Sequence, residues 1–153
     1  MEIELVWGTG EGATALSAFD AALADGGIHN YNLVTLSSVI PPEASVVRQD
    51  THTREWPVGE FVATVLSKNT STVTGETIAA GLGWAQATEG GVFFEATAES
   101  GENVDALLVR GVQTAQSVRD DWNWQTEIQT KIVEHTVTHN GAVVVAALYR
   151  PVC

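Results

Sequence analysis

Two consecutive serines, Ser37 and Ser38, stand between an apolar stretch and two prolines in "NLVTLSSVIPPEA", residues 32–44. The hydroxyl of Ser38 can attack the carbonyl carbon of Ser37, which converts the peptide into an ester through an N→O acyl shift, and distortion of the peptide favours this step. Elimination of the ester leaves dehydroalanine, and hydrolysis then leaves a pyruvoyl group at a new N-terminus. Such a ketone forms a Schiff base with an amine and accepts electrons as pyridoxal phosphate does. The plain alternative is a strand that ends in two exposed loop serines.

Two acidic residues stand among apolar neighbours. Asp20 follows Phe19 in a stretch rich in Ala and Leu, and Glu95 interrupts "VFFEA". If Glu95 points inward, burial raises the pKa of its carboxyl group and makes it a proton donor. If the alternation of the strand turns it to solvent, it is an ordinary surface residue. The sequence leaves both interpretations open.

A glycine motif precedes the first predicted helix. Gly8, Gly10 and Ala13 match G-x-G-x-x-A, the pattern of a dinucleotide-binding turn between a strand and a helix. Glu11 would place a carboxylate where a pyrophosphate binds, and the next strand ends in serines rather than in an acid that could hold a ribose. We therefore favour a glycine-rich turn that lets the strand and the helix pack closely.

Metal and disulfide chemistry has little support in the sequence. His135 and His139 are four residues apart on a predicted strand, where they would share a face, but no third ligand accompanies them. The only cysteine is Cys153, so we expect neither an internal disulfide nor a cysteine metal cluster. We expect no metal cofactor.

The charge balance excludes several partners. The formal net charge is -12, from 19 acidic and 7 basic residues among 153. Such a surface repels nucleic acid and anionic lipid, and we expect neither as a partner.

The sequence has no apolar run of about 18 residues and no basic, hydrophobic leader, so we expect a cytoplasmic protein that spans no membrane. Few lysines, many acids and a core rich in Ala, Val and Thr favour a protein that works in high salt.

The elements that must position these residues follow from hydrophobic periodicity. The pattern predicts a β-rich α+β fold of one domain, residues 1–153, with two main helices covering sheet faces. It also predicts a closing hairpin with Asn140-Gly141 as its turn, and an irregular region over 43–60. A loop, "GTGEGA", is expected after the first strand. Strands are expected over 3–7, 32–38, 60–67, 77–87 and 91–99, and helices over 14–27, which Gly26 ends, and 102–122.

Several motifs together point to a known family. "GEGATALSAFDAALADGGIHNYNLVTLSSVIPPEA" strongly resembles the pyruvoyl-dependent arginine decarboxylases. The match continues through "TGETIAA", "VFFEATAE" and "VEHTVTHNGAVVVAALY", so it covers nearly the whole chain. The resemblance implies a four-layer αββα sandwich, assembled as a homotrimer or hexamer with sites between subunits. It also implies self-cleavage between Ser37 and Ser38 into a β chain, 1–37, and an α chain, 38–153, headed by a pyruvoyl cofactor derived from Ser38.

The resemblance also implies roles for single residues. Asn32 matches the asparagine that assists the site and self-processing, Glu95 the proton donor, and Asp20 the acid that pairs with the substrate guanidinium. The activity implied is conversion of L-arginine to agmatine and carbon dioxide, which feeds polyamine synthesis. Two alternatives remain open: the same chemistry on another amino acid, or a relative that does not cleave and acts as an interaction or regulatory subunit.

Overall fold

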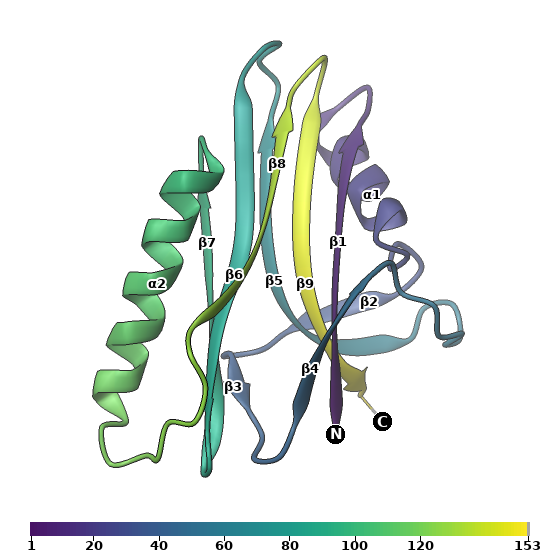
Figure 1. The fold of residues 1–153 in the computed structure, drawn as a ribbon. Helices are drawn as coiled ribbons and strands as arrows, with labels where there is room; N and C mark the ends of the chain where they lie inside the picture. The colour runs from purple at the N-terminus through teal and green to yellow at the C-terminus, as the bar shows by residue number, and fades with distance from the viewer. Residues whose placement is uncertain (153) are drawn as a thin grey trace.

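Two β-sheets stacked face to face form the centre of the molecule, and one helix covers the outer face of each (Figure 1). The computed structural model describes residues 1–152. Its helices are α1 (Ala15–Asp25) and α2 (Gly101–Val118). Its strands are β1 (Glu2–Glu11), β2 (Asn32–Thr35), β3 (Val39–Ile40), β4 (Ser45–Asp50), β5 (Phe61–Ser71), β6 (Thr77–Ala87), β7 (Gly90–Ala98), β8 (Gln129–Thr136) and β9 (Gly141–Pro151).

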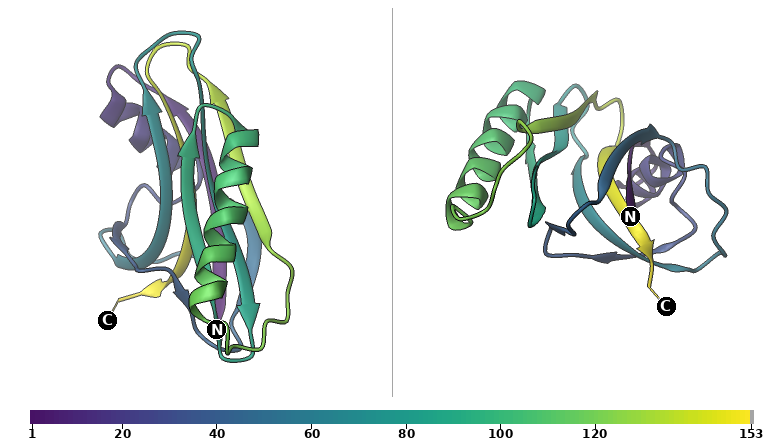
Figure 2. Two further views of the ribbon diagram at one scale, coloured as in Figure 1. Left: turned by 90° about the vertical axis from the view of Figure 1, so that its left-hand side faces the viewer. Right: turned by 60° about the horizontal axis from the view of Figure 1, so that its bottom comes forward.

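The order of strands confirms the predicted α+β sandwich. The first sheet runs β2-β5-β9-β1-β4 and the second β3-β7-β6-β8. Helix α1 packs on β1 and β9 of the first sheet, and α2 packs on β6 and β7 of the second. The layers are therefore helix, sheet, sheet and helix, as the turned views in Figure 2 also show.

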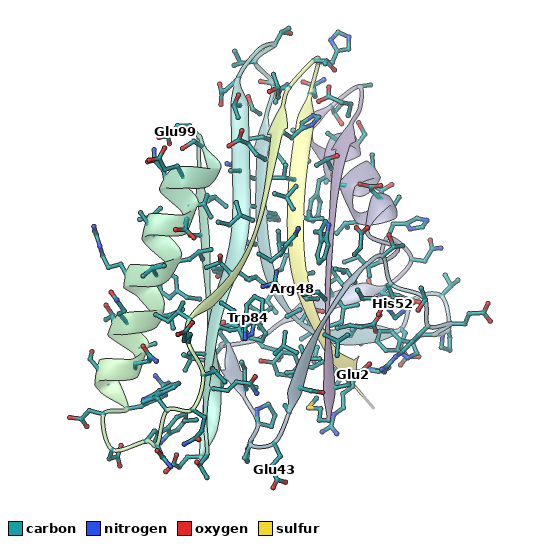
Figure 3. All side chains as sticks on the ribbon, viewed as in Figure 1. Glu2, Glu43, Arg48, His52, Trp84 and Glu99 are labelled. Carbon is teal, nitrogen blue, oxygen red and sulfur yellow. The ribbon has the colours of Figure 1, made fainter. Side chains whose placement is uncertain are left out.

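Alternation along β6 shows how the core is divided. Leu82 and Trp84 lie in the core between the two sheets. Gly81 and Gly83 face the other way, where a Cβ would lie 2.9 Å from Val104 and 3.1 Å from Leu108 of α2, so the glycines let this helix approach the strand. The predicted strand over 77–87 and its apolar face are confirmed. Across the same core, the guanidinium of Arg48 on β4 lies 5.0 Å from the ring centre of Trp84 (Figure 3).

The loop expected after the first strand is wrong, because β1 continues through the glycine motif to Glu11. A Cβ on Gly8 would lie 2.3 Å from the Ala22 carbonyl oxygen, and one on Gly10 2.4 Å from the Ala22 nitrogen. The glycines thus bring strand and helix together, as we favoured, but from within a strand. A strand in this position forms no phosphate-binding turn.

The closing hairpin is also wrong. β8 pairs with β6 in the second sheet, whereas β9 pairs with β1 and β5 in the first, so the chain changes sheets at Asn140-Gly141. The physical reason lies in burial. β9 is buried from Gly141 to Tyr149 and takes the central place of its sheet, whereas β8 is a partly exposed edge strand.

Two further boundaries differ from expectation. Region 43–60 contains β4, a partly exposed edge strand that runs parallel to β1 and carries too weak an apolar pattern to be recognised. α2 ends at Val118, short of the predicted 122. Gly26 caps α1 as predicted. This helix buries Ala18 and Ala22 and leaves Leu16 77% exposed.

No helix within residues 1–152 has the length and apolar character needed to cross a membrane.

Candidate functional site

The serine pair lies where the chain crosses from one sheet to the other. The amide of Leu36 donates to the Thr64 carbonyl at 3.0 Å, which continues the pairing of β2 with β5 in the first sheet. The carbonyl of Ser38 accepts from the Phe93 amide at 2.9 Å, where β3 begins to pair with β7 in the second. Ser37 therefore lies between two anchors that belong to different sheets, in the connection that runs from β2 to β3 (Figure 1).

The backbone at this crossing is strained. Ser38 has φ 78°, in the left-handed region that residues with a Cβ rarely adopt. Such a conformation costs on the order of 1–3 kcal/mol and persists only where its surroundings impose it. Beyond β3, the amide of Ala44 donates to the Pro41 carbonyl at 3.3 Å, which closes a turn that returns the chain to the first sheet.

Tyr149 ties the two sheets together next to the crossing. From β9 in the first sheet, its hydroxyl donates to the Val39 carbonyl at 2.7 Å, at the start of β3 in the second. Burial raises the pKa of Tyr149, so the phenol stays protonated and remains a donor. The chain is thus held at the carbonyls of both Ser38 and Val39, directly after the candidate cleavage point.

A groove of about 410 Å³ opens beside the serine pair. The serines and Val39 form one wall, and β7 contributes residues 92–95. The last turns of α2 form the other wall through Ala115 and Arg119. The structure therefore brings Ser37, Ser38 and Glu95 to one groove.

Glu95 lies on the face of β7 that points toward the first sheet. Phe93, two residues earlier, packs in the core between the sheets, and alternation gives Glu95 the same direction. β3 pairs with β7 only at Gly91 and Val92, so the strand edge beside Glu95 is open. The residue is exposed, yet desolvation raises the pKa of its carboxyl group. A carboxyl group with this bias toward the neutral form, beside the serine pair, is placed to donate a proton.

Asp20 and Asn32 do not line this groove. Asp20 is exposed on α1, in a separate hollow of about 490 Å³ that it shares with Leu16 and Phe19. The side-chain amide of Asn32 donates to the Gly59 carbonyl at 2.9 Å, at the far end of β2 from the serines. The fold of one chain thus brings Glu95, but neither Asp20 nor Asn32, to the serine pair.

Sequence reasoning missed Tyr149 and Arg119. Tyr149 ends a quoted motif but had no role assigned to it, and Arg119 stands in no motif. Tyr149 reaches Val39, and Arg119 reaches the groove, only because β9 and the end of α2 meet β3 in space. The two histidines have other neighbours. His135 contacts the carboxylate of Glu11 at 2.6 Å, and residues 1–152 hold no group of three or more His, Cys, Asp or Glu side chains arranged to bind a metal ion.

Comparison with known proteins gives one consistent result. The family model for pyruvoyl-dependent arginine decarboxylase matches residues 2–151. A pyruvoyl-dependent arginine decarboxylase of Halobacterium salinarum is 35% identical over 149 residues, covering 96% of this chain and 92% of the relative. One of Methanocaldococcus jannaschii is 34% identical over 149 residues, covering 95% and 87%. One of Thermoplasma volcanium is 39% identical over 84 residues, covering 55% and 46%.

Proposed function

The chain belongs to the pyruvoyl-dependent arginine decarboxylase family, and from this premise we propose that it cleaves itself between Ser37 and Ser38 and then converts L-arginine to agmatine and carbon dioxide. Cleavage yields fragments 1–37 and 38–153. One observation carries the proposal: the Ser37–Ser38 peptide spans two sheets, with Ser38 in a strained conformation at a groove that also holds Glu95. The agmatine feeds polyamine synthesis.

Self-cleavage proceeds through the hydroxyl of Ser38. Its oxygen attacks the Ser37 carbonyl carbon, the C–N bond breaks, and the nitrogen of Ser38 becomes a free amine while the chain continues as an ester. Loss of the Cα proton of Ser38 and rupture of its Cβ–O bond release Ser37 as a carboxylate and leave dehydroalanine. Water then replaces the nitrogen, which leaves as ammonia. The strain at Ser38 favours the first step, since breaking the peptide releases it.

The groove fits the group that these steps create. Residue 38 lies in its wall, and the bond from the Phe93 amide to the residue 38 carbonyl holds the new terminus there. The pyruvoyl ketone supplies a Schiff base to the substrate amine and an electron sink for the bond to the carboxylate. The role of Glu95 is to protonate the former α-carbon of the substrate after carbon dioxide leaves, and the raised pKa of its carboxyl group suits that role.

The separation of Asp20 from the serine pair supports sites between subunits. Asp20 pairs with the substrate guanidinium, and a bidentate fit favours arginine over lysine. Because Asp20 lies in a different hollow from Ser38, a single chain does not bring the two to one substrate, and a second copy supplies the missing part. The same holds for Asn32, which assists processing. Exposed Leu16 beside Asp20 offers apolar surface for such an assembly, a homotrimer or a hexamer.

The acidic surface suits a cytoplasm of high salt, and its charge repels nucleic acid and anionic membranes.

Two other functions remain as candidates. The same chemistry on another amino acid is the second candidate, because Asp20 alone selects for the guanidinium. A relative that does not cleave, acting as an interaction or regulatory subunit, is the third.

Intact mass of three proteins tests the proposal. The wild-type protein should appear as residues 1–37 and 38–153, the latter blocked and reducible by borohydride. Ser38→Ala lacks the attacking oxygen and should stay whole and inactive, whereas Ser37→Ala keeps that oxygen and should still cleave. A panel of amino acids then identifies the substrate. A wild-type chain that stays whole after long incubation in high salt would refute self-processing and favour the regulatory relative.

A further inference from the structure

One cation is fixed in the wall of the serine groove. Arg119, at the end of α2, donates from Nη1 to the Ala115 carbonyl at 3.1 Å, and its guanidinium lies 5.5 Å from the ring centre of Trp122. The indole nitrogen of Trp124 donates to the Arg119 carbonyl at 3.1 Å. Backbone and side chain are thus both held, and Arg119 lines the groove of Ser37, Ser38 and Glu95.

The charge of Arg119 is not neutralised by a neighbour. Within residues 1–152, ion pairs involve only Arg54, His52 and His135 as cations, although the chain has 19 acidic residues and 7 basic ones. The bond to Ala115 engages one of the five N–H donors of Arg119, which leaves four for other partners. A held arginine of this kind can stabilise negative charge that forms in the groove.

Two groups could present negative charge to Arg119 in the groove, the substrate carboxylate and the Ser37 carbonyl oxygen, and only the second gains charge during its reaction. The substrate carboxylate is already charged on binding and loses that charge as carbon dioxide leaves, so a cation beside it would stabilise the ground state more than the transition state. The Ser37 carbonyl oxygen instead becomes an oxyanion when Ser38 attacks. A fixed donor beside it stabilises the transition state, as oxyanion holes do.

We propose that Arg119 stabilises the oxyanion of Ser37 during self-cleavage, an inference that rests on the proposed self-processing. Attack by Ser38 turns the carbonyl carbon tetrahedral and places the negative charge on its oxygen. Arg119 donates a hydrogen bond to that oxygen and transfers no proton. When the C–N bond breaks, the carbonyl reforms as the ester, and the departing nitrogen takes up the proton that the Ser38 hydroxyl gave up on attack, so the step is balanced.

The test measures the rate of cleavage in freshly made Arg119→Gln, Arg119→Met and Arg119→Lys proteins, by intact mass over time. Each neutral variant should slow cleavage about 10²–10³-fold, the cost of losing one oxyanion donor. Lys, which keeps the charge, should recover part of the rate. The Met variant keeps an apolar stem against Trp122, and thermal melting of all three separates lost folding from lost chemistry.

Arg110→Gln is the matched control. Arg110 lies on the same helix but borders another hollow, beside Leu107, so its loss should leave cleavage unchanged. A folded Gln or Met variant that cleaves at the wild-type rate would overturn the proposal. If the KM for arginine rises in that variant instead, the cation binds the substrate carboxylate. Failure of self-processing as such is distinct, because the wild-type protein would then stay whole as well.

Discussion

Replacing Tyr149 with Phe tests whether the tie between the sheets drives self-cleavage. The change removes one hydroxyl, whose hydrogen bond to the Val39 carbonyl is 2.7 Å long, and leaves the buried ring in place. Val39 follows the scissile peptide and begins β3. Without this bond, the chain beyond Ser38 can relax toward the groove, and part of the strain at Ser38 is released before cleavage rather than by it.

The magnitude follows from the bond itself. A hydrogen bond of this kind contributes about 0.5–1.5 kcal/mol net, and Val39 borders an open groove where water can replace the lost donor. If that energy sustains the strained precursor, its loss slows cleavage between about two- and tenfold. The free energy of unfolding of the uncleaved protein, measured in the Ser38→Ala background, should fall by about the same amount.

The assay is intact mass over time, beside a thermal melt. Tyr31→Phe is the matched control, because it removes a hydroxyl that accepts from the Trp56 amide at 3.4 Å, away from the groove. It should leave the cleavage rate unchanged. Should Tyr149→Phe lose stability yet cleave at the wild-type rate, the tie would be structural only, and the strain at Ser38 would have another source.

Three further predictions concern single carboxylates. Asp20→Asn should leave cleavage intact but weaken arginine binding by about 2–5 kcal/mol, at least ~30-fold in KM, and an unchanged KM would refute the guanidinium pairing. Glu95→Gln should be processed, but its turnover should fall about 10²–10⁴-fold. In the wild type, kcat should fall as pH rises through the raised pKa of Glu95, and the variant should not show this pH dependence. Full activity of the variant would make Glu95 an ordinary surface residue. The bond to His135 is the largest cause that lowers the pKa of Glu11 from 4.5 to about 2, so the wild type should melt above Glu11→Gln at pH above 4.5 and lose that advantage as pH falls toward 2. A Tm difference that does not change over this range would contradict the last.

Local patterns predicted the elements better than their partners. The strand over 77–87 and the end of the first helix at Gly26 depend on neighbours in sequence, and both are confirmed. The hairpin at Asn140-Gly141 failed because a turn motif reports the bend but not the sheet to which each arm belongs. Burial along β9 decides its place, because a strand that is apolar on both faces must lie inside a sheet rather than at an edge.

The site divides in the same way. The adjacency of Ser37 and Ser38 suggested the cleavage hypothesis beside a plain loop, and an acid within an apolar strand made Glu95 a candidate. Tyr149 could not be found, because its role comes from a contact with Val39 across 110 residues. The strain at Ser38 was equally hidden, because the residues that hold the chain on either side of it, Thr64 and Phe93, are distant in sequence and lie in different sheets.

The location of the proposed cleavage point is compatible with a chain that is cut without losing its fold. Fragment 1–37 carries β1, α1 and β2, and β1 lies between β9 and β4, with Ile3 and Leu5 fully buried. Hydrogen bonds to β9 and burial of these side chains hold the fragment without a covalent link. The Ser37–Ser38 peptide lies between residues that pair in different sheets, so its loss breaks no pairing within either sheet. The proposed cleavage there can release the strain at Ser38 while both sheets stay in place.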